Sequence, residues 1–295
     1  SKARHLPGVP VDNTLICDNV GALDLADVPK ELVIIGAGVI GLEMGSVWRR
    51  LGAKVTILEA LPDFLSVADA DIAKEAARVF AKQGLEIQLG VTLGDIKARK
   101  KNVAITYTDR TGQAQQMVAD RLIVSIGRVP NTDGLNAEAV GLKLDERSFV
   151  DVDAQGRTNL PGVWAVGDVT NGPMLAHKAM EDAVMVAEVI AGQAGQRHYG
   201  TIPWVLYTHP EIAWVGKTEQ ALKAQGIAYK VGKIPFAANG RALGMGEPIG
   251  FVKMLADAAS DRILGVHIIG ANASELISEA VVAMEFAGCS EDLAR

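Results

Sequence analysis

A glycine-rich turn between an apolar strand and a helix constrains the fold of this chain more than any other feature. Residues 31–35 (ELVII) are apolar and rich in β-branched side chains, which predicts a strand buried on both faces. The turn GAGVIG at 36–41 follows, residues 42–51 have helical spacing, and residues 54–59 predict a second buried strand. Strand, helix and strand within about 30 residues predict one βαβ unit with parallel strands and a right-handed crossover.

The three glycines of this turn predict a dinucleotide site. Gly36 allows the tight turn, Gly38 lets a pyrophosphate approach the backbone, and Gly41 lets the helix pack closely on the strand. The unpaired N–H groups and the positive dipole end of the helix attract the phosphates. Glu59 ends the second strand, where a carboxylate accepts hydrogen bonds from a ribose diol and repels a 2′-phosphate. The sequence therefore predicts NAD rather than NADP.

The remaining N-terminal residues extend this unit in both directions. The first 29 residues are rich in turn formers and predict an extended segment with little core of its own. Residues 69–82 predict a helix and 85–89 a third parallel strand. Residues 103–118 predict an antiparallel hairpin, and 120–126 another buried strand.

The texture of the sequence changes near residue 131 and again near residue 200. Strands are expected at 149–152 and 162–166, and a long helix at 175–191. Five short strands then alternate with turns, at 203–208, 212–215, 229–235, 251–256 and 263–269. With a helix near 218–225, they predict an α+β unit with an antiparallel sheet. Asn272 and Glu275 predict the start of a helix that ends at Ala287, and Ser290 is expected to cap one more.

A second candidate site follows the strand expected at 162–166. Asp168 would lie at the carboxyl end of that strand, where its carboxylate can accept hydrogen bonds from a polyol such as a ribityl chain. Residues 174–177 would lie at the start of the next helix, where the dipole favours negative charge. An aspartate that only caps a turn explains the pattern equally well.

Composition excludes several other classes of protein. The net charge of −6 gives no reason to expect nucleic acid or an anionic membrane as partner. No apolar run reaches the ~18 residues that cross a bilayer. Cys17 and Cys289 are far apart, and no His/Cys cluster has metal-ligand spacing, so we expect ordinary thiols in a reducing compartment and no metal.

His209 with Glu211 invites a general-base interpretation, but a loop before a strand explains that segment better.

Three ordered segments resemble the signatures of the pyridine nucleotide–disulfide oxidoreductase family: 36–43 (GAGVIGLE), 125–131 (SIGRVPN) and 158–168 (TNLPGVWAVGD). Later segments are most similar to the dihydrolipoamide dehydrogenase branch of that family: 174–179 (MLAHKA), 207–211 (YTHPE) and 235–242 (PFAANGRA). The resemblance extends over essentially the whole chain. It implies an α/β fold with a Rossmann-like NAD-binding domain, part of an FAD-binding domain, and an α+β interface domain.

The resemblance also implies the residues of both sites. It places NAD contacts at Gly36, Ala37, Gly38, Val39, Ile40, Gly41, Leu42, Glu43, Glu59, Leu93 and Gly127. It places FAD contacts at Asp168, Met174, Leu175, Ala176 and His177. In such enzymes electrons pass from dihydrolipoyl thiols to a protein disulfide, then to FAD, then as hydride to NAD. The resemblance further implies a homodimer, partners in a 2-oxo acid dehydrogenase complex, and a bacterial cytoplasmic or mitochondrial matrix location.

Two parts of the family pattern do not occur in this sequence. The family begins with a separate FAD-binding βαβ unit and a CxxxxC redox pair, and it carries a catalytic His–Glu pair near its C-terminus. We therefore expect a fragment: a lead-in at 1–29, the NAD-binding domain at 30–130, the C-terminal part of the FAD domain at 131–198, and a truncated interface domain at 199–295. No catalytic residue is expected in it, and the chain alone should be inactive. Two alternatives stay open: a sister reductase (a mercuric reductase or soluble transhydrogenase), or a non-catalytic NAD-binding and dimerisation module.

Overall fold

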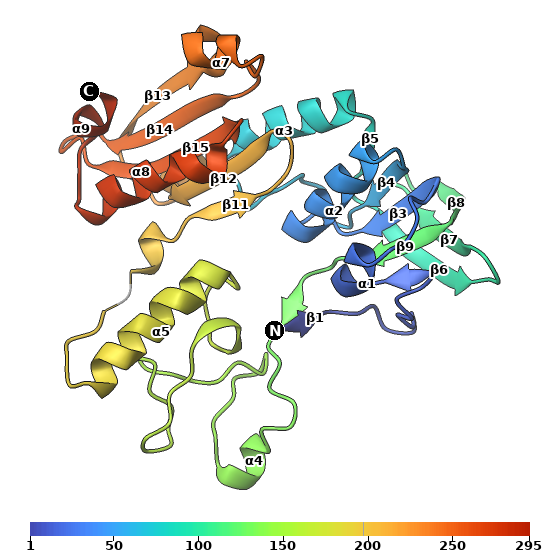
Figure 1. Cartoon of the computed structure of the whole chain (residues 1–295), viewed down its shortest axis with the longest axis horizontal. Helices are drawn as coiled ribbons and strands as arrows, with labels where there is room; N and C mark the ends of the chain where they lie inside the picture. The colour runs from blue at the N-terminus through green and yellow to red at the C-terminus, as the bar shows by residue number, and fades with distance from the viewer. Residues whose placement is uncertain (197) are drawn as a thin grey trace. The chain divides into compact units, whose positions relative to one another are not determined.

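The computed structural model describes residues 1–196 and 198–295, which form two compact units. The first unit comprises residues 1–4 and 127–202, and the second comprises 5–126 and 203–295. The chain therefore leaves the second unit after Ile126 and returns to it at Pro203 (Figure 1). Each unit has its own core and is described separately.

A five-stranded parallel sheet organises the N-terminal part of the second unit. Its strand order is β2–β9–β3–β4–β5, with bounds β2 (Ile16–Cys17), β9 (Arg121–Val124), β3 (Glu31–Ile35), β4 (Lys54–Leu58) and β5 (Leu85–Gln88). Side chains alternate between the two faces of a strand, so Leu32 and Ile34 lie in one core cluster while Val33 and Ile35 lie in another. The βαβ unit expected from the sequence is present, with β3 and β4 parallel and in register.

Different elements cover the two faces of this sheet. The cluster around Ile34 contains side chains of α2 (Val39–Arg50) and α3 (Ala70–Lys82). The cluster around Val33 contains side chains of a three-stranded antiparallel sheet, β6 (Thr92–Ala98), β7 (Val103–Thr108) and β8 (Ala114–Ala119). Both faces of the parallel sheet are thus buried, which explains the continuous apolar runs of its central strands.

One sequence-based expectation is wrong in this region, and another is confirmed but incomplete. Residues 16–17 form β2, which pairs in parallel with β9, and both side chains are buried, so the first 29 residues do contribute core. They also form α1 (Asn19–Leu23). The hairpin expected at 103–118 has a third strand, β6, whose side chains are mostly exposed. Both elements escape local patterns because one is only two residues long and the other lacks an apolar run.

The C-terminal part of the second unit is a five-stranded antiparallel sheet. Its order is β11 (Trp204–Leu206), β12 (Glu211–Gly216), β15 (Ile263–Gly270), β14 (Phe251–Asp257) and β13 (Tyr229–Pro235), which confirms the five strands expected from the sequence. Helix α8 (Ala273–Glu285) packs on one face, where Ile277 and Ala280 join a core with β12 and β15. Shorter helices are α6 (Glu219–Ala224), α7 (Gly240–Gly244), η3 (Phe236–Ala238) and α9 (Ser290–Ala294).

The last helix begins one residue away from its expected cap. Cys289, not Ser290, is the N-cap of α9, because Asp292 accepts a hydrogen bond from the Cys289 N–H at 3.0 Å. The Ser290 hydroxyl instead donates to Asp261 at 2.7 Å. The expected cap is therefore wrong, although the helix is present.

The first unit has little regular structure. It contains β1 (Lys2–Ala3) paired with β10 (Arg128–Val129), the helices α4 (Ala137–Val140) and α5 (Ala176–Ile190), and the short turns η1 (Gly167–Val169) and η2 (Tyr199–Thr201). The strands expected at 149–152 and 162–166 are wrong, because Val150 and Trp164 make only isolated bridges. A strand pairs with an extended neighbour over several residues, whereas each pairing of these described segments is a single bridge.

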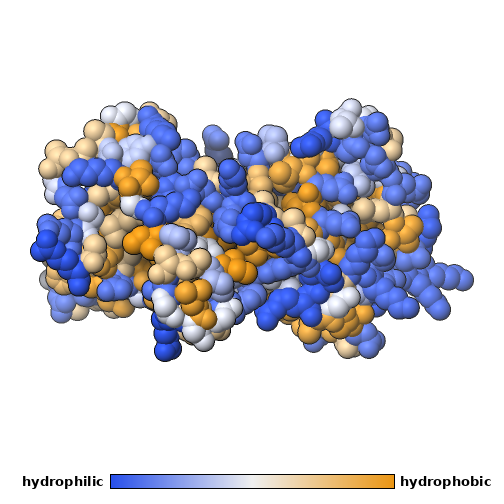
Figure 2. Space-filling model, turned by 90° about the horizontal axis from the view of Figure 1, so that it is seen from above, coloured by the Kyte–Doolittle hydropathy of each residue, from blue (hydrophilic) through white to orange (hydrophobic). Residues whose placement is uncertain are grey.

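The surface is mixed rather than continuously apolar. Figure 2 shows hydrophobic side chains in separate groups among hydrophilic ones on the face it presents. Among residues 1–196 and 198–295, no helix combines the length and apolar character that crossing a bilayer requires.

Candidate cofactor-binding sites

The glycine turn at 36–41 is tight at both ends and open in the middle. Gly36 has φ +101°, and a Cβ added there would lie 2.2 Å from the Ser125 carbonyl oxygen. A Cβ on Gly41 would lie 2.0 Å from the Gly36 carbonyl oxygen, where the helix meets the strand. A Cβ on Gly38 would meet nothing within 4 Å. A phosphate can therefore approach the backbone at Gly38, while the first and third glycines hold the turn in shape.

Glu59 lies beside this turn because β3 and β4 run in parallel and in register. Its Oε2 accepts a hydrogen bond from the Ala37 N–H at 2.7 Å, and its Oε1 accepts one from the Leu61 N–H at 2.8 Å. The carboxylate is thus fixed at the carboxyl ends of the strands, the edge where open α/β sheets bind their ligands. A carboxylate has about four acceptor positions, so two remain for a ribose diol.

Helix α2 begins directly at the turn and offers its backbone rather than a capping side chain. Its N-cap is Gly38, which makes no side-chain cap bond. Leu42 is one of the predicted contacts on α2. Its side chain is fully buried in the core, so only its backbone could contact a cofactor. Ala37 is buried and Val39 and Ile40 are half-buried at the start of the helix. The first N–H groups of a helix have no acceptor within the helix, so a start without a capping side chain has the chemistry to bind a phosphate.

Glu43, the last residue of the GAGVIGLE motif, faces the interface sheet. Its Oε1 accepts a hydrogen bond from the Tyr207 N–H at 2.9 Å, just after β11. Burial raises the pKa of the Glu43 carboxyl above its usual value, although the Tyr207 N–H opposes that shift. The glycine-turn helix and the YTHPE segment are therefore joined by one hydrogen bond, which the sequence did not indicate.

The other two predicted NAD contacts lie on other segments of the chain. Leu93 is on β6, half-buried against the core below the three-stranded sheet. Gly127, with φ +103°, belongs to the first unit, where its carbonyl oxygen accepts the Arg4 N–H at 3.0 Å. The structure thus brings Gly36–Glu43 and Glu59 together in one place.

The predicted FAD contacts lie on two neighbouring elements of the first unit. Asp168 is on η1, its side chain is 29% exposed, and its carboxylate accepts the Ser1 hydroxyl. Arg128 donates to the same hydroxyl at 2.6 Å. Helix α5 begins at Ala176 and His177, directly after Met174 and the N-cap Leu175. The Leu175 side chain makes no hydrogen bond to the first turn. The partly exposed carboxylate is an acceptor suited to the hydroxyls of a polyol. The start of α5 has backbone N–H donors suited to a pyrophosphate.

A buried ion pair that sequence reasoning missed lies next to Asp168. Lys178 and Asp182, one helical turn apart on α5, are both 0% exposed, and their charged atoms are 2.7 Å apart. Lysine and aspartate four residues apart on an otherwise apolar helix face were the available signal.

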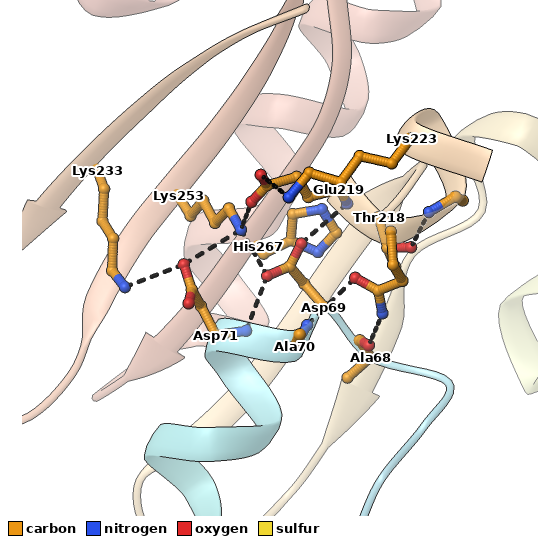
Figure 3. A network of polar contacts seen from close by, with 12 residues as sticks. Ala68, Asp69, Ala70, Asp71, Thr218, Glu219, Lys223, Lys233, Lys253 and His267 are labelled. Carbon is orange, nitrogen blue, oxygen red and sulfur yellow. Dashed lines mark hydrogen bonds and ion pairs between the residues drawn. The ribbon is translucent and has the colours of Figure 1, made fainter. Parts of the chain in front are cut away.

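A second missed cluster joins the parallel sheet's helix α3 to the interface sheet. Figure 3 shows Lys253 of β14 among the carboxylates of Asp69, Asp71 and Glu219. The ammonium lies 2.7 Å from Asp69, 2.6 Å from Glu219 and 3.2 Å from Asp71, and Lys253 is 1% exposed. We call these four residues the Lys253 cluster. They come from three segments that lie far apart in sequence, so no local pattern could find the cluster.

The charges of the Lys253 cluster stabilise one another. Hydrogen bonds from Lys223, then Lys253 and Tyr229, lower the pKa of Glu219 to about 2. Burial alone would raise the pKa of Asp69, but the hydrogen bond from Lys253 and the Glu219 N–H hold it below its usual value. Burial also opposes the charge on Lys253, yet its carboxylate partners raise its pKa. His267 lies beside them in Figure 3, and burial lowers its pKa.

The structure does not join His209 and Glu211 into a catalytic pair. The His209 ring lies 3.9 Å from the carboxylate of Glu247, while Glu211 accepts the Ser274 N–H at the start of α8. Glu211 therefore has a structural partner, as the loop interpretation predicts. Within the described part of the chain, no group of three His, Cys, Asp or Glu side chains could hold a metal ion.

Comparisons with known proteins agree with this architecture. Residues 1–183 match the model of the pyridine nucleotide-disulphide oxidoreductase family, and residues 202–295 match the model of its dimerisation domain. The chain is 62% identical over 295 residues to a dihydrolipoyl dehydrogenase of Cupriavidus necator and 46% identical over 296 aligned positions to the mitochondrial dihydrolipoyl dehydrogenase 1 of Arabidopsis thaliana.

The matches cover this chain fully and its relatives in part. The chain spans 62% of the Cupriavidus protein and 58% of the Arabidopsis protein. Among solved structures, the HOCl-induced flavoprotein disulfide reductase RclA of Escherichia coli superimposes with a TM-score of 0.88 at 30% identity, covering 98% of this chain and 66% of RclA. The family match extends over more than half of the chain. The chain therefore belongs to the pyridine nucleotide–disulphide oxidoreductase family.

Proposed function

We propose that this chain forms the NAD-binding and dimerisation part of an NAD-linked dihydrolipoyl dehydrogenase. The observation that carries the proposal is the glycine turn, open at Gly38 and closed at Gly36 and Gly41, with the Glu59 carboxylate fixed beside it. The 62% identity to a dihydrolipoyl dehydrogenase supports this substrate class over that of a sister reductase. We assign the NAD-binding domain to 30–130, the partial FAD domain to 131–198 and the interface domain to 199–295.

NAD would bind through the backbone of the turn and the carboxylate of Glu59. The N–H groups at the start of α2 would hold the pyrophosphate, because the dipole and the unpaired donors both favour negative charge there. Glu59 would accept the ribose hydroxyls, and its negative charge would repel the 2′-phosphate of NADP. Its hydrogen bonds to Ala37 and Leu61 would keep it in place before the cofactor arrives.

FAD would be held in part by the first unit. Asp168 would accept a hydroxyl of the flavin's polyol chain, and the first turn of α5 at Met174–His177 would face its negatively charged groups. FAD supplies two-electron chemistry between thiols and a nicotinamide, and the protein supplies binding and orientation. The chain contains no CxxxxC pair, so the chain alone would not oxidise dihydrolipoamide. We also expect the chain alone to bind NAD weakly.

We propose that the full-length protein is a homodimer associated through the interface domain. The match of residues 202–295 to a dimerisation domain supports this assembly. Binding to components of a 2-oxo acid dehydrogenase complex follows from the proposed substrate. A bacterial cytoplasmic or mitochondrial matrix location fits the bacterial and mitochondrial relatives.

Cofactor titration of this chain tests the NAD assignment. We expect NAD⁺ to bind by calorimetry and NADP⁺ to bind at least about tenfold more weakly, because the 2′-phosphate would meet a carboxylate. Glu59→Ala should weaken NAD⁺ binding about tenfold, the cost of hydrogen bonds to a charged group. Glu86→Gln is the matched control, since that carboxylate lies on the next strand and accepts the Thr56 hydroxyl. Equal affinity for both cofactors would contradict the assignment.

Activity is tested on the full-length protein that contains this chain. We expect it to reduce NAD⁺ with dihydrolipoamide and this chain alone to show no turnover. A full-length protein that reduces a different disulfide substrate, and not lipoamide, would favour the sister-reductase alternative. Turnover by this chain alone would contradict the proposal that the chain by itself is inactive.

A further inference from the structure

A buried ion pair on α5 holds the turn that carries Asp168. The ammonium of Lys178 donates to the Gly167 carbonyl oxygen at 2.9 Å and to the Thr170 hydroxyl at 2.8 Å, and it pairs with Asp182 at 2.7 Å. The Asp182 carboxylate accepts the Gly167 N–H at 3.1 Å and the Tyr199 hydroxyl at 3.1 Å. Both polar groups of the Gly167 backbone are therefore held by one charged pair.

The backbone conformation of Gly167 brings the turn into direct contact with α5. Gly167 has φ +73°, and a Cβ added there would lie 3.1 Å from the Ala179 Cβ, so the turn packs directly on α5. Lys178 and Asp182 lie one turn apart on the same face of the helix, so both can reach this turn. The next residue after Gly167 is Asp168. Any change in the ion pair thus reaches Asp168 through a single peptide unit.

Burying both charges of an ion pair carries a desolvation penalty. That penalty often exceeds the attraction between the charges, so an apolar pair of similar size frequently makes the fold as stable or more stable. An apolar pair could fill the same volume, but it would leave the Gly167 N–H without its present acceptor. The pair is therefore better explained by what it positions than by stability.

We propose that Lys178 and Asp182 are positioning residues for FAD. They fix η1 relative to the start of α5, so that the Asp168 carboxylate and the first-turn N–H groups of α5 keep one spacing for the cofactor. This inference rests on the proposed function, because it assigns a role toward the flavin that the family membership implies.

The test uses the full-length protein and a charge-free double variant. Lys178→Met with Asp182→Leu removes both charges and retains apolar volume, so we expect the protein to fold with an unchanged or higher unfolding temperature. We expect its dissociation constant for FAD, titrated into apoprotein, to rise about tenfold or more, since Gly167 loses hydrogen bonds to charged groups. The visible circular dichroism of any bound flavin should also change. Glu181→Gln is the matched control: it removes an exposed carboxylate from the same helix and should leave flavin affinity unchanged.

A second measurement keeps the inference testable if the double variant folds poorly. In the chain described here, hydrogen exchange of the peptide containing Gly167 should accelerate about tenfold or more in Asp182→Asn and stay unchanged in Glu181→Gln. A double variant that folds and binds FAD within twofold of the wild type overturns the positioning role and leaves the proposed function intact. A wild-type full-length protein that binds no FAD overturns both.

Discussion

Each glycine of the 36–41 turn has its own steric reason. The carbonyl oxygens of Ser125 and Gly36 exclude a side chain at Gly36 and Gly41, whereas the space in front of Gly38 is open. Gly45, one turn further along α2, faces the Ile57 methyl group, and an added Cβ would lie 3.0 Å from it. The end of an isoleucine side chain can move, but a backbone carbonyl in a tight turn cannot. Substitutions at Gly41 and Gly45 should therefore differ in cost.

Gly41→Ala should damage both stability and cofactor binding. Its Cβ would overlap the Gly36 carbonyl oxygen, so helix and turn must separate, which we expect to cost about 2 kcal/mol of unfolding free energy. NAD⁺ affinity should fall at least about tenfold, because in the proposed site the displaced N–H groups would hold the pyrophosphate. Gly45→Ala should cost less than about 1 kcal/mol, since alanine is the better helix former. Urea unfolding and NAD⁺ titration measure both effects, and unchanged binding by Gly41→Ala would contradict the role of the turn.

Helix α3 is attached to the interface sheet at both of its ends. At its N-terminus, Asp69 caps the helix through the Asp71 N–H and also accepts the Lys253 ammonium and the Glu219 N–H. At its C-terminus, the Gln83 side chain donates to the His209 carbonyl oxygen. Helix α3 thus joins the parallel-sheet part and the interface part of the second unit, in addition to the Glu43–Tyr207 hydrogen bond of α2, and the Lys253 cluster is the charged part of the α3 contact.

Lys253→Met should destabilise the protein far more than the loss of a surface ion pair. The substitution leaves Asp69, which is fully buried, without its cation, and the expected loss of unfolding free energy is about 3–5 kcal/mol. Lys97→Met is the control, because Lys97 pairs with Asp95 on the surface and should contribute less than about 1 kcal/mol. Denaturant unfolding of both variants measures the difference. A loss below 1 kcal/mol for Lys253→Met would show that the joint does not depend on this charge.

Carboxylates with lowered pKa values in both units make the whole molecule sensitive to acid. Glu219 has a pKa of about 2, and hydrogen bonds from Thr111 and Gln115 lower the pKa of Asp109 to about 2. Burial would raise the pKa of Asp153, but backbone N–H groups that donate to its carboxylate lower it. Because the unfolded chain binds protons more readily at these groups, they stabilise the fold above their unfolded pKa values. That stability is lost as the pH falls through the folded values.

The unfolding free energy should therefore decrease from about pH 5 down to about pH 2. Glu219→Gln should make this decrease shallower, because one carboxylate with a low folded pKa is gone. Denaturant melts at several pH values give the slopes, and identical slopes for Glu219→Gln and the wild type would contradict the assigned charge network.

Local sequence patterns determined the strand–turn–helix–strand unit, the five strands of the interface sheet and the family. These features depend on contiguous residues: β-branched runs, glycines in a fixed order, and turn formers between strands. The position of Glu59 beside the turn also followed, because parallel neighbours end at the same edge of a sheet.

Only the tertiary structure decided the remaining features. It placed residues 16–17 in the parallel sheet, left 149–152 and 162–166 without a ladder, and brought Lys253 to Asp69 and Glu219. The same holds for the hydrogen bonds from Lys178 and Asp182 to Gly167. The physical reason is common to all of them. Pairing, burial and charge neutralisation depend on which distant segment lies opposite, and a local period does not carry that information.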